Sequence, residues 1–210
     1  CMSRLDELIA ELCPDGVEYK MLNTVAEIGT GSSNRVDADE DGIYPFYVRS
    51  KNVMKSNKYI FDEEAIIIPG EGGIGEIFHY INGKYDLHQR AYRIHFFDNY
   101  INAKFAYYYL MSNFKKFIMM KAVNATVTSI RKPMIECFLI PVPPLPVQQE
   151  IVRILDKFTA LEAELEARKK QYEYYRNELL KFDDSIPMFA LGEVCSVQSG
   201  STPSKKKTEY

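Results

Sequence analysis

Tryptophan is absent from this chain of 210 residues, and cysteine is scarce. The four cysteines are scattered without a Cys-x-x-Cys pair, which argues against a zinc site and suits reduced thiols in a cytoplasm. No apolar run reaches the 18 residues of a membrane span, and the N-terminal residues lack the basic start and apolar stretch of a signal peptide. From these absences we expect a cytoplasmic protein that does not cross a membrane.

Catalytic signatures are missing as well. The motifs Gly-x-Ser-x-Gly, His-Glu-x-x-His, the P-loop and the Asn-Pro-Pro-aromatic motif of methyltransferases do not occur. His79, His88 and His95 fall within 17 residues, but no carboxylate or cysteine stands at a ligand-like spacing from them. We therefore expect a non-catalytic chain that holds no metal and no cofactor.

A glycine-rich string at 70–75 matches the Gly-x-Gly-x-x-Gly pattern of dinucleotide-binding proteins. That pattern needs a helix N-terminus to hold the pyrophosphate, whereas the residues that follow alternate like a strand. The string is better explained as a loop that joins two strands and lets backbone come close to another group. A plain tight turn is the alternative.

Charge is distributed unevenly along the chain. The net charge is −3, but residues 1–42 carry 3 basic and 10 acidic side chains, whereas residues 43–146 carry 13 basic and 8 acidic. A polyanion responds to the local field, so the middle block is where nucleic acid could bind. An ordinary solvated surface is the alternative explanation.

Hydrophobic periodicity predicts an α+β protein. An amphipathic helix is predicted over 3–12 with Ser3 as its N-cap, and a second helix over 102–121 with Asn102 as its N-cap. Between them lie β-rich runs, including a buried strand at 64–69 and two runs that flank an Asn-Gly-Lys turn at 82–84. The two flanking runs are 76–81 and 91–97, and further β-rich runs lie at 25–28, 43–48 and 58–62.

A long heptad helix is predicted over 147–182, after the proline-rich stretch 141–146. Nine of the ten a and d positions are apolar or aromatic, and Arg168 breaks the series. At 1.5 Å per residue this helix would be roughly 54 Å long, too long to bury its seam against one domain of its own. A helix that lies along its own core is the alternative. We expect a partner helix at positions Ile151, Ile154, Phe158, Leu161, Leu165, Tyr172, Tyr175 and Leu179.

The end of the chain repeats its beginning. At an offset of 169 residues, Leu22 matches Leu191, Val25 matches Val194, and Gly31 matches Gly200. The chain therefore reads as one full unit and the opening of a second. We expect domain 1–146, the helix 147–182, and the start of a second repeat over 183–210.

Four motifs resemble the specificity subunits of type I restriction–modification systems. They are Leu-x-x-Val-x-x-Ile-x-x-Gly at 22–31, LHQRAYRI at 87–94, TVTSIRK at 126–132, and IPVPPLPVQQEIVRIL at 140–155. The resemblance covers essentially the whole chain. It implies a β-rich target recognition domain followed by a coiled-coil spacer helix. Such subunits hold two recognition domains, so this chain looks like a half subunit that could form a homodimer.

The resemblance also implies partners. These are double-stranded DNA and the methylation and restriction subunits, on which S-adenosylmethionine, ATP and magnesium would bind. Candidate DNA-binding residues are polar or basic side chains and the glycines of the loop: Arg49, Ser50, Lys51, Asn52, Lys55, Lys58, Gly72, Gly73, His88, Gln89, Arg90, Thr126, Thr128, Ser129, Arg131 and Lys132. Each could instead be a solvated or fold-supporting residue.

Two other functions remain open. One is a coiled-coil adaptor whose globular domain binds protein and not DNA, and the other is an enzyme that uses the glycine loop. DNA binding with a steep salt dependence would separate the first from a recognition subunit, and a nucleotide-binding assay would test the second.

Overall fold

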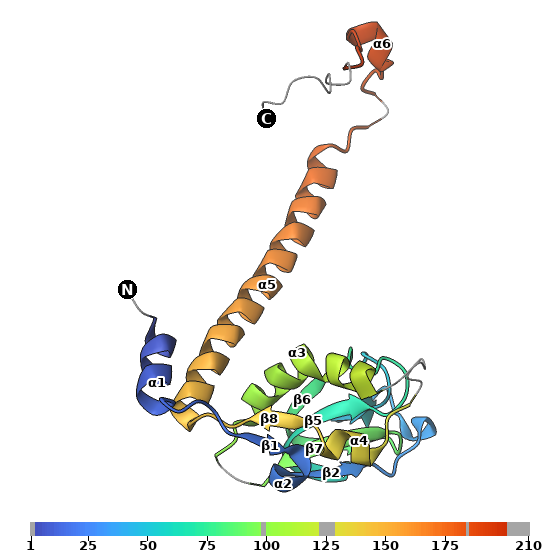
Figure 1. The fold of residues 1–210 in the computed structure, drawn as a ribbon. Coiled ribbons are helices and arrows are strands. Elements are labelled where there is room, and N and C mark those ends of the chain that lie inside the picture. The colour runs from blue at the N-terminus through green and yellow to red at the C-terminus, as the bar shows by residue number, and fades with distance from the viewer. Residues whose placement is uncertain (1–2, 98–99, 122–128, 184, 201–210) are drawn as a thin grey trace. The chain divides into compact units, whose positions relative to one another are not determined.

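The computed structural model describes residues 3–97, 100–121, 129–183 and 185–200. The chain divides into two compact units, 1–159 and 160–210. The first unit is a mixed sheet with helices, and the second contains most of a long helix (Figure 1). This arrangement confirms the α+β class and the long helix that the sequence predicts. None of the helices in the described part of the chain has the length and apolarity that a membrane span requires.

A six-stranded sheet forms the centre of the first unit. Its neighbouring strands are antiparallel except for one parallel pair, β3 with β6. In spatial order the strands are β2 (Ala26–Thr30), β7 (Ala91–Phe96), β5 (Phe61–Pro69), β6 (His79–Leu87), β3 (Tyr44–Tyr47) and β4 (Met54–Ser56). A separate two-stranded sheet pairs β1 (Tyr19–Met21) with β8 (Leu139–Pro141).

Helices cover one face of the large sheet. Figure 1 shows α3 (Ala103–Lys121) lying along it, and buried side chains of α3 pack with Ile66, Ile68 and Ile94 of the sheet. The opposite face has a smaller apolar cluster around Tyr85. The remaining helices are α1 (Arg4–Leu12), α2 (Leu22–Val25), the 3-10 turn η1 (Arg35–Asp37), α4 (Lys132–Glu136), α5 (Leu145–Leu179) and α6 (Leu191–Val194).

Side-chain caps start the two amphipathic helices where the sequence predicts them. The Ser3 hydroxyl accepts from the backbone N–H of Asp6, and the Asp6 carboxylate accepts from the Ser3 N–H, which makes a capping box. The Asn102 side-chain oxygen accepts from the N–H groups of Lys104 and Phe105. Both predicted N-caps are therefore confirmed.

The prediction of a turn at Asn82-Gly-Lys84 is wrong. β6 runs through these residues, and Gly83 pairs with Glu63 of β5. Gly83 has a φ of 124°, so glycine serves here inside a strand and not at a turn. β6 also begins at His79, later than the predicted run at 76–81, and the predicted runs 58–62 and 64–69 join in the single strand β5.

The sheet curls so that two separated parts of it meet. Ser33, just after β2, bridges His88, just after β6, although two strands lie between β2 and β6 in the sheet. Gly31 lies against the end of β6, where an added Cβ would be 1.8 Å from the Leu87 carbonyl oxygen. This close approach requires glycine at position 31 and places the loops after β2 and β6 together.

Helix α5 is continuous, as predicted, but its bounds are shifted from 147–182 to Leu145–Leu179. Pro146 is tolerated because it stands in the first turn, where a backbone N–H has no helical partner. The buried side chain of Gln148 fixes this end of the helix. It donates to the carbonyls of Tyr100 and Pro143 and accepts from the N–H of Asn102.

The second unit contains a short helix whose local geometry resembles that of α2. α6 has the same length and the same offset as α2, and the flanking residues Met21 and Ala190 have nearly identical backbone angles. The burial differs completely, because Leu22 is 0% exposed and Leu191 is 72% exposed. In the described part of 183–200 no strand follows α6.

Candidate nucleic-acid interface

Loops from four places in the chain line a cleft of about 560 Å³. They are η1, the segment between β3 and β4, the glycine loop after β5 and the loop between β6 and β7. The curl of the sheet brings the last of these beside the segment after β2. The lining side chains are Arg35, Val48, Arg49, Ser50, Asn52, Met54, Glu71 and His88, together with Gly72.

Two arginines converge on one carboxylate in this cleft. Arg49 Nη1 lies 2.6 Å from Glu71 Oε2, and Arg90 Nη1 lies 3.2 Å from the same oxygen. All three side chains are partly exposed, so solvent screens the ion pairs and their main effect is on orientation. The cleft therefore presents two guanidinium groups in set positions and carries a net positive charge.

His88 is a buried polar residue that lines the cleft. Its Nδ1 accepts a hydrogen bond from the backbone N–H of Arg90. Burial lowers the pKa of His88 below the ordinary histidine value, and the nearby charges of Arg49 and Arg90 lower it further. The remaining ring nitrogen, Nε2, is then the protonated one and can act as a donor.

The structure brings five of the predicted DNA-binding residues to the lining of this cleft: Arg49, Ser50, Asn52, Gly72 and His88. Arg90 joins them through Glu71. Gln89 is next to the cleft, and its Nε2 donates to the Asn34 side-chain oxygen over 2.5 Å. Whether these residues touch DNA remains a prediction.

The predicted lysines at positions 51, 55 and 58 lie outside the cleft lining. Lys51 is exposed in the segment after β3, and Lys55 is exposed on β4. Lys58 pairs with Asp37 of η1 at 3.5 Å. Gly73 follows Gly72 in the loop, with a φ of 59°.

The predicted residues near 130 are divided between two places. The backbone of Ser129 bridges Glu71, and the Ile130 N–H donates to the Gly70 carbonyl, so this segment supports the glycine loop. Arg131 occupies the N-cap position of α4 without a capping hydrogen bond from its side chain, and Lys132 pairs with Glu136 along the same helix. Thr126 and Thr128 lie outside the described residues.

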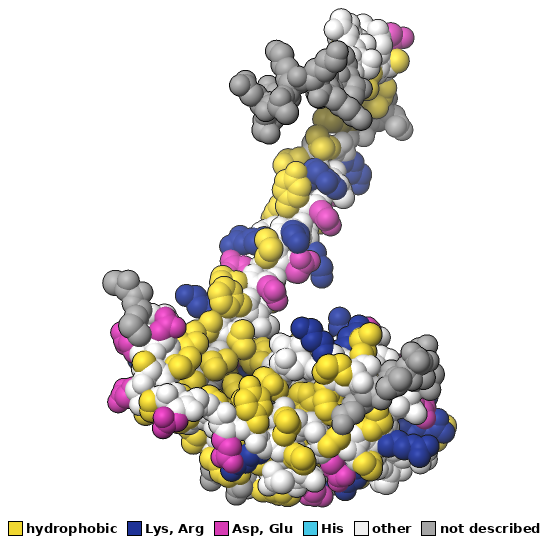
Figure 2. Space-filling model, in the orientation of Figure 1, with side chains coloured by type: hydrophobic (Ala, Val, Ile, Leu, Met, Phe, Trp, Pro, Cys, Tyr) yellow, Lys and Arg dark blue, Asp and Glu magenta, His cyan; other side chains and the backbone are white. Residues whose placement is uncertain are grey.

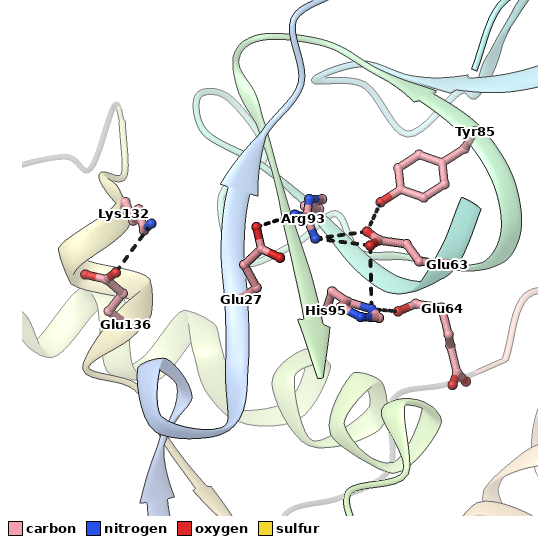
Figure 3. A network of polar contacts seen from close by, with 8 residues as sticks. All are labelled: Glu27, Glu63, Glu64, Tyr85, Arg93, His95, Lys132 and Glu136. Carbon is pink, nitrogen blue, oxygen red and sulfur yellow. Dashed lines mark hydrogen bonds and ion pairs between the residues drawn. The ribbon is translucent and has the colours of Figure 1, made fainter. Parts of the chain in front are cut away.

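A polar network crosses the sheet face that the helices leave open (Figure 3). Arg93 of β7 pairs with Glu27 of β2 and with Glu63 of β5, and Tyr85 of β6 donates to Glu63. Four adjacent strands are thereby joined. The Arg93 side chain is 8% exposed and Glu63 is 15% exposed, whereas Glu27 is largely exposed. The network therefore stabilises the pairing of these four strands in the curled sheet.

Four lining residues of the cleft are not among the predicted ones: the apolar Val48 and Met54 and the charged Glu71 and Arg35. Glu71 stands inside the glycine string, but a carboxylate was not an expected group in a DNA-binding surface. Arg35 falls in residues 1–42, which have a net negative charge, so no nucleic-acid contact is predicted there. The short helical turn η1 places the Arg35 side chain at the cleft, although the surrounding segment is acidic on average.

The predicted dimerisation positions change character along α5. Ile151 and Ile154 are half-buried in the first unit. From Phe158 onward the seam is open, with exposures of 50% for Leu161, 55% for Leu165 and 76% for Leu179. Figure 2 shows hydrophobic side chains recurring along this helix with charged ones between them.

Comparison with known proteins places the chain in a family. The sequence profile of the type I restriction modification DNA specificity domain matches residues 14–172. The chain belongs to this family. The match includes the cleft, the polar network and most of α5.

Individual relatives of this specificity domain agree with the assignment. A putative type I restriction enzyme specificity subunit of Haemophilus influenzae is 31% identical over 87% of this chain and 51% of its own length. The EcoDI specificity subunit of Escherichia coli is 31% identical over 81% of this chain and 36% of its own length. The chain thus spans about half or less of these curated relatives.

A solved structure supports the fold of the specificity domain. The S subunit of a type I restriction–modification system from M. genitalium superposes with a TM-score of 0.59 at 18% identity, over 81% of this chain and 47% of that one. This likeness concerns the fold alone.

Proposed function

We propose that this chain is the DNA sequence-specificity component of a type I restriction–modification complex and is not itself catalytic. The observation that carries the proposal is the cleft of the specificity domain, where Arg49 and Arg90 are oriented by one carboxylate beside polar Ser50 and Asn52. Arginine and asparagine are the side chains that pair with base edges in two-point contacts.

The domain would read one half of a bipartite target. The open seam of α5 supports pairing with the same helix of a second copy, because exposed Leu161, Leu165 and Leu179 recur on one heptad face. A two-fold axis would then map one recognition domain onto the other, so the homodimer would read an inverted repeat.

The remaining parts of the complex would supply the chemistry. Methylation and restriction subunits would assemble with this chain in the cytoplasm and would bind S-adenosylmethionine, ATP and magnesium, leaving this chain without a cofactor of its own. An apolar groove of about 370 Å³ between α1, α3 and the start of α5 is a surface that suits a protein partner; Tyr19, Tyr109, Val147 and Ile151 are among its lining residues.

A salt titration tests the central step. Fluorescence anisotropy of a labelled random-sequence duplex with the full chain should show affinity that falls steeply as salt rises, since phosphate contacts release counterions. Replacing Lys51 and Lys55 by glutamine should reduce the slope by roughly one to two units. The matched pair Lys169→Gln and Lys170→Gln on α5 should leave the slope unchanged. Absence of salt-dependent binding would overturn the proposal and favour the protein-binding adaptor.

A further inference from the structure

Glu71 is out of place in a surface that only neutralises phosphates. A carboxylate next to the DNA backbone repels the phosphates. The negative charge of Glu71 also offsets part of the positive charge of Arg49 and Arg90. Lys51 and Lys55 are exposed nearby, and no ion pair to either is found among the described residues. The cleft thus separates a group suited to base edges from basic groups suited to phosphates.

We propose that Glu71 is a specificity-determining residue and that the Arg49–Glu71–Arg90 cluster reads a G·C base pair. The inference rests on the proposed function of DNA recognition. Guanine offers the acceptors O6 and N7 to a guanidinium, and cytosine offers the N4 amino group to a carboxylate. The cluster contains both complementary groups within one ion-paired set.

The hydrogen-bonding capacity of the cluster fits this role. Both arginines contact Oε2 of Glu71 through Nη1, and within the described chain Oε1 accepts no hydrogen bond. Oε1 is therefore available to the cytosine amino group. Each guanidinium is tied through one nitrogen only, which leaves its other N–H donors for guanine in an orientation that Glu71 sets.

The backbone around Glu71 is held independently of its side chain. Gly70 donates to the Arg90 carbonyl, Ile130 donates to the Gly70 carbonyl, and Glu71 bridges Ser129. Gly72 follows with a φ of 65°, and an added Cβ there would meet nothing within 4 Å, so the loop is open to a close ligand. Changing the Glu71 side chain should therefore alter recognition without dismantling the loop.

The test compares Glu71→Gln with wild type in a selection from duplexes with a randomised core. Each full-length protein is incubated with the pool, and the bound duplexes are sequenced. We expect the wild-type motif to contain a G·C pair at which Glu71→Gln reduces preference by about tenfold while the other positions keep theirs. Glu71→Asp, which keeps the charge but shortens the side chain, should weaken the preference for the same pair.

Glu76→Gln is the matched control, because Glu76 stands in the same loop but pairs with Lys115, away from the cleft lining. It should select the wild-type motif. An unchanged motif for Glu71→Gln, or a uniform loss at every position, would overturn the role of Glu71. A wild-type protein that selects no motif would instead contradict the proposed function itself.

Discussion

At the scale of single residues, Arg93 joins three strands of the network in Figure 3, its own β7 with β5 and β2. Its guanidinium bonds Glu63 and Glu27 and lies over the ring of Phe61, 4.5 Å from its centre. Replacing Arg93 by methionine leaves the Glu63 carboxylate buried without its cation. We expect the free energy of unfolding to fall by about 3 kcal/mol, measured by urea titration.

Glu27→Gln serves as the control for that substitution. Glu27 is 54% exposed, so solvent screens its ion pair with Arg93 and the expected loss is below about 1 kcal/mol. Equal losses from the two substitutions would show that the buried Arg93–Glu63 pair has no special weight in the sheet.

Only part of the cleft could be predicted at this scale. Arg49 and Asn52 are predicted because arginine and asparagine can contact base edges, and His88 is also among the predicted residues. Their convergence with Glu71 depends on the curl of the sheet, which brings loops far apart in sequence together. No local pattern in the sequence carries that information.

At the scale of elements, the first turn of α5 depends on Gln148. Its amide satisfies three backbone groups, of Tyr100, Asn102 and Pro143. Gln148→Ala leaves these groups unpaired in a buried setting, so we expect a loss of about 2–4 kcal/mol in unfolding free energy. Gln149→Ala, one residue along and exposed, should change it by less than about 0.5 kcal/mol. A similar loss of unfolding free energy from both substitutions would contradict the anchoring role of Gln148.

Helices were easier to predict than strands for a physical reason. Caps such as Ser3 and Asn102 act within three residues of themselves, so the sequence shows them directly. The Asn82-Gly-Lys84 string has the composition of a turn, but pairing with β5 keeps it extended. Tertiary pairing outweighs a local preference worth about 1 kcal/mol.

Comparison of α2 with α6 separates the local causes of helix formation from the tertiary causes of burial. α2 and α6 have similar backbone geometry at their N-caps, and their first and last residues, leucine and valine, recur at an offset of 169. Leu22 is buried by the sheet of the first unit, whereas Leu191 remains exposed. The short helix therefore forms at both places, whereas only the helix in the first unit is buried.

At the scale of the whole molecule, the open seam of α5 predicts association. Leu161→Glu with Leu165→Glu places charge at two seam positions and should convert a dimer to a monomer in sedimentation velocity. Ala160→Glu with Ala163→Glu adds the same charge off the seam and should leave the dimer intact. A dimer that survives the leucine substitutions would show that the seam is not the interface.

The most direct measurement of the central claim is the methylome of a strain in which this chain is the only specificity chain, expressed with methylation subunits. We expect methylation at one bipartite motif, made of an inverted repeat with a fixed spacer, that disappears when the chain is deleted. An asymmetric motif that depends on the chain would contradict the homodimer. Methylation that is the same with and without the chain would contradict its role in DNA recognition.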